Sequence, residues 1–109
     1  MAYLFYGNGV EPIEMPDRLL AHLKVVVATK LRRGESFTLS WRHPHEAGRT
    51  TIWLQPAIPL RFVFSSSEPE ILDPAWLKEL ANAANSSRGL NVDLAEPVAA
   101  DARAPLQAA

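Results

Sequence analysis

The chain has no cysteine, no long apolar run and almost no net charge. Without thiols there is no disulfide framework, no thiolate metal site and no cysteine nucleophile, which is typical of an intracellular protein. No stretch approaches the roughly 20 apolar residues that span a bilayer, and the first residues lack the basic and then apolar pattern of a signal peptide. We therefore expect a cytoplasmic protein that does not bind a membrane.

The remaining composition predicts one small domain. With 109 residues, of which 48% are hydrophobic, the chain can bury a modest core but cannot hold several domains. We place this domain at residues 1–94, because residues 95–109 combine Ala, Pro and scattered charge without a period and predict a disordered tail. Residues 16–65 hold eight Lys or Arg against three Asp or Glu, which permits contact with a polyanion without requiring it.

Residues 16–34 show the pattern of an amphipathic helix that packs on a sheet. Pro16 and Asp17 favour its start, with Asp17 capping the first amides, and Gly34 favours its end. Lys30 falls within the apolar face, where we expect its stem to pack while its ammonium reaches water or the last carbonyls. The apolar face contains Leu19, Leu20, Leu23, Val26, Val27 and Leu31. The opposite face is predicted to contain Arg18, His22, Val25, Thr29 and Arg33.

The other segments predict strands and one more helix. Residues 3–6 and 10–15 favour a hairpin whose second arm lies at a sheet edge, because Pro12 cannot donate to a ladder. Alternating residues predict strands at 36–42, 49–55 and 60–64. Asp73 and Pro74 favour a second helix, which ends before Gly89 and is followed by a candidate short strand at 90–94. The fold class is therefore α+β: a two-layer domain in the order β-β-α-β-β-β-α, with a mostly antiparallel sheet of about five strands and both helices on one face.

If the strands at 36–42, 49–55 and 60–64 are adjacent, the sheet face away from the helices is a candidate binding surface. Trp53 would then lie between Arg42 and Arg61, and could stack a nucleic-acid base while the guanidiniums meet phosphate. The alternatives are a surface for a protein partner or a second copy, or a face that the N-terminal hairpin covers. Arg32 and Arg33 extend the basic candidates. The predicted face contains Thr38, Ser40, Arg42, Thr51, Trp53, Gln55, Arg61 and Val63.

No pattern for catalysis, a cofactor or a metal emerges. The serines lie beside turns and caps, without a neighbouring histidine and acid that would form a nucleophilic triad. His43, His45 and Glu46 are a metal-like cluster, but zinc sites usually need three or four convergent ligands, so we predict a solvated hairpin loop instead. We expect no cofactor.

Several segments resemble a family of roughly hundred-residue bacterial proteins of unknown function. The resemblance is carried by residues 20–27, 30–37, 51–54, 84–87 and 89–90, with the sequences LAHLKVVV, KLRRGESF, TIWL, ANSS and GL. It covers nearly everything except the tail. Members of that family are often labelled ATP-dependent DNA ligase, which would imply a lysine that forms an adduct with AMP.

The ligase label can be compared with the residues themselves. Ligases place the nucleophilic lysine in a Lys-x-Asp-Gly setting, whereas Lys30 is followed by Leu31, Arg32, Arg33 and Gly34. The Asp is missing and the Gly is one residue late, so Lys30 does not match the ligase motif. Our first hypothesis is a non-catalytic interaction module, the second a nucleic-acid-associated protein that uses a basic face, and the third an enzyme of the ligase kind.

Overall fold

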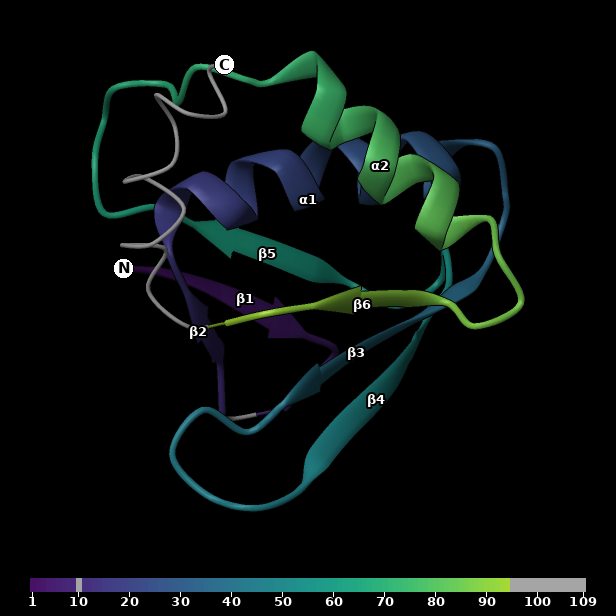
Figure 1. Cartoon of the computed structure of the whole chain (residues 1–109), viewed down its shortest axis with the longest axis horizontal. Coiled ribbons are helices and arrows are strands. Elements are labelled where there is room, and N and C mark those ends of the chain that lie inside the picture. Colours follow the sequence, from purple (N-terminus) through teal and green to yellow (C-terminus); the bar gives the residue numbers. More distant parts are fainter. Residues whose placement is uncertain (10, 95–109) are drawn as a thin grey trace.

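The computed structural model describes residues 1–9 and 11–94, and within them the predicted α+β class and element order are confirmed (Figure 1). The predicted tail at 95–109 lies outside the described residues. The elements are β1 (Ala2–Tyr6), β2 (Ile13–Met15), α1 (Asp17–Arg32), β3 (Phe37–Arg42), β4 (Arg49–Leu54), β5 (Leu60–Val63), α2 (Pro74–Ala84) and β6 (Leu90–Val92).

The described strands form two sheets of three strands, where the sequence had suggested one sheet of about five. The first has the order β2-β1-β5 and is antiparallel, so the second arm of the hairpin lies at an edge as predicted. The second has the order β4-β3-β6, with β6 parallel to β3. The link at residues 56–59 contains two prolines, which interrupt the strand ladder after β4. The chain then pairs with β1 as β5, and the Gly7 N–H donates to the Pro59 carbonyl at 2.9 Å at the start of this pairing. The adjacency of β4 and β5, on which the predicted binding face depended, is therefore not present.

The hydrophobic core lies between α1 and the inner faces of both sheets. Both helices lie together on one side of the strands, with α2 beside α1 (Figure 1). The largest fully buried apolar side chains come from α1 and from five strands: Leu4, Met15, Leu20, Leu23, Val27, Leu39, Leu54 and Leu90. Side chains of α1 belong to the same core cluster as residues of both sheets, so the burial of α1 links the two sheets.

The two helices begin differently. Asp73 caps α2 as predicted, since its carboxylate accepts from the N–H groups of Ala75 at 3.0 Å and Trp76 at 3.4 Å. For α1 the predicted cap is wrong: the N-cap is Pro16, and Asp17 is already helical. Its carboxylate instead accepts from the Ser65 backbone N–H at 2.9 Å and from the Ser65 hydroxyl. Burial raises the pKa of Asp17, but the hydrogen bonds from Ser65 and the nearby N-terminal ammonium together lower it more, so the pKa lies below its ordinary value.

His22 was predicted on the exposed face of α1, and this prediction is wrong. The side chain is fully buried, because α2 covers this side of the helix. Its Nδ1–H donates to the Arg18 carbonyl at 2.7 Å, and its Nε2 accepts from the Asp73 N–H at 2.8 Å. The Trp76 ring lies 4.3 Å away, centroid to centroid. These contacts fix one neutral tautomer, and burial lowers the pKa of His22.

Candidate functional site

Trp53 lies on the outer face of β4 with 54% of its surface exposed. The inner face of the same strand carries the half-buried Ile52 and the fully buried Leu54. The register pairs Trp53 with Thr38 of β3, and it pairs Thr51 with Ser40, whose hydroxyls are 2.7 Å apart. The predicted exposure of the indole on the face away from the core is therefore confirmed.

The hydrogen-bond pattern shows which backbone groups of β4 point away from the sheet. The His43 N–H donates to the Gly48 carbonyl at 2.9 Å, and hydrogen-bonded pairs alternate along an antiparallel ladder from that point. Arg49, Thr51 and Trp53 consequently direct their N–H and C=O groups outward, whereas Ile52 directs its groups to Leu39. The Trp53 carbonyl accepts from the Tyr6 hydroxyl of the other sheet.

Among the described strands, β4 is the longest at a sheet edge. It has six residues, compared with three in β2, four in β5 and three in β6. Pro12 and Pro59 directly precede β2 and β5, whereas no proline lies in or next to the paired residues of β4. Short strands and prolines protect an edge from pairing with other chains, so β4 is the least protected edge. We call the side chains and outward backbone groups of Arg49, Thr51 and Trp53 the β4 surface.

The predicted arginines are not gathered around Trp53. Arg42 lies on the same sheet, but four residues along β3 from Thr38, a distance of roughly 14 Å at the usual rise of a strand. Arg61 belongs to β5 in the other sheet, where its guanidinium lies 4.1 Å from the centroid of Phe5. Arg32 and Arg33 are exposed at the end of α1.

Arg49 is the arginine that sequence reasoning missed. The register places it directly opposite Arg42, and neither guanidinium forms an ion pair within the described residues. The signal was present in the sequence, because a hairpin centred on residues 43–48 sets residue 42 opposite residue 49.

The turn at residues 43–48 forms a hairpin loop, as predicted. The His43 Nε2 lies 2.8 Å from the Thr50 hydroxyl, and its Nδ1 lies 3.3 Å from the Ala47 carbonyl and 3.4 Å from the Glu46 carboxylate. In the part of the chain that the structure describes, no three His, Asp or Glu side chains are placed to hold a metal ion. His43 is therefore a fixed structural element of this turn.

Lys30 ends inside the protein and not at the helix carbonyls. Only 9% of the residue is exposed, and its Nζ donates to the Asn85 side-chain carbonyl at 2.6 Å and pairs with Glu35 at 3.1 Å. The ammonium lies 5.6 Å from the centroid of Phe37. This lysine thus connects the C-terminal ends of α1 and α2, and its amine is already engaged.

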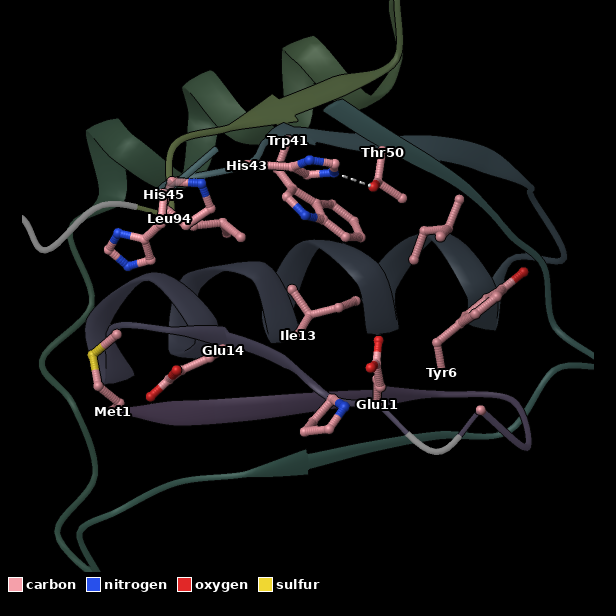
Figure 2. A pocket seen from close by; sticks show the side chains of 14 residues that line it. Met1, Tyr6, Glu11, Ile13, Glu14, Trp41, His43, His45, Thr50 and Leu94 are labelled. Carbon is pink, nitrogen blue, oxygen red and sulfur yellow. Dashed lines mark hydrogen bonds between the residues drawn. The ribbon is translucent and has the colours of Figure 1, made fainter. Parts of the chain in front are cut away.

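An open cleft of about 850 Å³ lies between the two sheets, and nothing in the sequence had indicated it. In Figure 2, Ile13 and Tyr6 of the first sheet face Trp41 of the second across this cleft. Its apolar lining continues the core and includes Tyr6, Ile13, Trp41, Ile52 and Leu94. Its polar lining includes Glu11, Glu14, His43, His45 and Thr50.

A family model described as Domain of unknown function (DUF7882) matches residues 1–95. The chain belongs to this family. The match confirms the resemblance to a family of unknown function and covers both sheets, both helices and the cleft of this DUF7882 domain. Comparisons with curated proteins and with solved structures gave no significant match. No helix among the described residues of this DUF7882 domain has the length and apolar character needed to cross a membrane.

Proposed function

We propose that the protein is a non-catalytic interaction module that binds a second copy of itself through the β4 surface. The observation that carries the proposal is the combination of an open six-residue edge with a tryptophan that is 54% exposed beside it. Tryptophan is among the residues that contribute most to binding energy at protein interfaces. Pairing of strand edges supplies backbone hydrogen bonds to such an interface.

The β4 surface is complementary to itself. When two identical strands pair antiparallel about Thr51, the Arg49 of each copy lies opposite the Trp53 of the other. The guanidinium can then pack against the indole, an arrangement in which a cation is attracted by the ring face. The Tyr6 hydroxyl occupies one lone pair of the Trp53 carbonyl, and the second lone pair remains for the ladder.

The test is the mass of the purified protein by light scattering over a range of concentrations. The proposal predicts a shift from monomer to dimer as concentration rises. Trp53→Ala removes the aromatic contact and should weaken dimerisation by roughly thirtyfold, or about 2 kcal/mol. Thr51→Pro removes an outward N–H, which β3 does not use, and should abolish pairing while the monomer stays folded.

Ile71→Ala is the matched control, since Ile71 is an exposed apolar side chain, 87% accessible, in the loop before α2. It should dimerise like the parent. A monomer at every concentration, or equal weakening in the Ile71 and Trp53 variants, would reject the proposal.

The second candidate function is binding of nucleic acid, and the facing pair Arg42 and Arg49 favours it. Like charges directly opposite on neighbouring strands are unfavourable unless an anion lies between them. A phosphate backbone would supply such anions, and Arg61, Arg32 and Arg33 would add further contacts. Retention on an oligonucleotide should then decrease steeply as salt rises, and Arg42→Ala should reduce it. Retention that is unchanged in the Arg42 and Arg49 variants would exclude this candidate.

The non-catalytic part of the proposal has its own test. Because the Lys30 amine is held by Asn85 and Glu35, we expect no covalent adduct when the protein is incubated with labelled ATP and magnesium. Label that is retained in the parent and lost in Lys30→Met would instead support an enzyme of the ligase kind.

A further inference from the structure

We infer that the cleft between the two sheets binds a small organic cation with an apolar, preferably aromatic, body. The cleft volume of about 850 Å³ lies within the range of small-molecule sites, roughly 300–1,000 Å³. Its interior is a partly open continuation of the hydrophobic core. It lies against the inner face of β4, opposite the Trp53 side chain, although the Tyr6 hydroxyl of its lining donates to the Trp53 carbonyl.

The walls of the cleft favour an apolar body. Tyr6 and Ile13 lie on one side and Trp41 on the other, and each is only partly buried (Figure 2). Two aromatic rings and an aliphatic side chain therefore remain partly in contact with water. A flat apolar group that fills this space would remove their surface from water, which is favourable in proportion to the area covered.

The polar lining favours a positive charge. Glu11 and Glu14 both line the cleft, and among the described residues no lysine or arginine lines it. Glu11 has no hydrogen bond or ion pair within the described chain. The Glu14 carboxylate accepts from the Tyr3 hydroxyl at 3.5 Å and lies with Tyr3 on the opposite face of the first sheet from Ile13, so the charge in the cleft comes from Glu11. The Trp41 and Tyr6 rings add favourable positions for a cation, provided that it lies within about 6 Å of a ring centroid.

A second, independent observation is a free donor inside the cleft. Within the described residues the indole N–H of Trp41 has no hydrogen-bond partner, and Figure 2 shows the ring directed into the space between the sheets. A ligand that covers the partly buried Trp41 ring would remove this N–H from bulk water, and a buried tryptophan N–H usually finds an acceptor. A ligand with a hydroxyl or ether oxygen besides its ammonium group would supply one.

His43 restricts the orientation of such a ligand. Its ring is held by Thr50 and by the turn, so it forms a fixed wall on the side of the second sheet. The Glu11 carboxylate comes from the segment just before β2, on the side of the first sheet. The ammonium group is thus expected at the first sheet, with the apolar body against Trp41.

The test follows the indole N–H resonances of the protein during titration with phenethylammonium. Trp41, Trp53 and Trp76 are the three tryptophans, and single Trp→Phe variants assign their signals. Phenethylammonium should shift the Trp41 signal saturably and leave those of Trp53 and Trp76 in place. The anion 3-phenylpropionate has a similar apolar body and should cause no saturable shift.

Charge-removing variants distinguish a site from non-specific contact. Glu11→Gln should weaken binding of phenethylammonium by about two- to fivefold, the effect usual for one exposed ion pair. Glu14→Gln, whose carboxylate lies on the other face of the first sheet, should have a smaller effect. Glu79→Gln, on the exposed face of α2, is the matched control and should bind like the parent. Equal binding of the anion, shifts at Trp53 in place of Trp41, or binding that is unchanged in Glu11→Gln would overturn the inference. None of these outcomes depends on whether β4 dimerises.

Discussion

His22 is a single side chain on which the contact between the two helices depends. It accepts from the N-cap residue of α2, stacks on Trp76 and donates to its own helix. Helical periodicity had placed it with the exposed residues, because periodicity detects one apolar face and α1 is covered on two sides. A polar residue that is buried by a second helix leaves no periodic signal of its own.

This burial predicts a pH-dependent stability. The pKa of His22 is lowered by burial in the folded protein, although the Arg18 carbonyl, Asp73 and Glu70 favour the charged form and the Arg18 charge opposes it. The unfolded chain therefore binds the proton at higher pH. The free energy of unfolding should be at its full value above the ordinary value of 6.5 and should decrease as the pH falls toward the folded-state pKa.

Urea unfolding at a series of pH values measures this dependence. His22→Gln should lower the free energy of unfolding by about 1–3 kcal/mol at neutral pH, because hydrogen bonds at a buried site are lost. It should also flatten the decrease below the ordinary histidine pKa. His45→Gln, at an exposed position in the turn, is the control and should keep the parental profile. The explanation fails if the parental decrease persists in His22→Gln.

At the scale of the elements, the local sequence predicted most of the secondary structure. Asp73 and Pro74 set the start of α2, Gly34 follows the end of α1, and the alternation around Leu39 matches the buried face of β3. These signals are local, since a cap, a turn or a period depends on residues that are near in sequence. The pairing of β6 with β3 is parallel and joins segments about 50 residues apart, so no local signal could indicate it.

The entry into β6 requires a glycine. Gly89 has a φ of +78°, and a Cβ at this position would lie 1.9 Å from the Thr38 hydroxyl oxygen. Gly89→Ala should therefore destabilise the protein by about 2–4 kcal/mol, through left-handed strain together with overpacking. Gly34→Ala is the matched control: its φ is +75°, but nothing lies within 4 Å of the added methyl group, so about 1 kcal/mol is expected.

Thermal or urea unfolding of both glycine variants measures the difference. Removal of the Thr38 hydroxyl in the double variant Gly89→Ala, Thr38→Ala should recover part of the loss. Equal destabilisation at the two glycines would show that the close approach of Thr38 has no energetic effect.

At the scale of the whole molecule, the division into two sheets creates both candidate sites. Because β5 leaves β4 and joins β1, β4 keeps an open edge and the two inner faces enclose a cleft. Arg61 is part of β5 and therefore lies in the other sheet, so the predicted cluster of Trp53 with two arginines does not form. Sequence reasoning found Trp53 from strand alternation. It missed that Trp41 and Glu11 line one cleft, since this depends on how the two sheets are placed.

The central claim is that the outward backbone of β4 pairs with a second copy, and amide hydrogen exchange at single residues tests it most directly. Ile52 pairs with Leu39 inside the sheet, so its N–H should be protected in dilute and concentrated protein alike. Thr51 directs its N–H outward, so its exchange should be fast in dilute protein and slow at concentrations where the dimer forms. Fast exchange of Thr51 at every concentration, with Ile52 protected throughout, would contradict the claim.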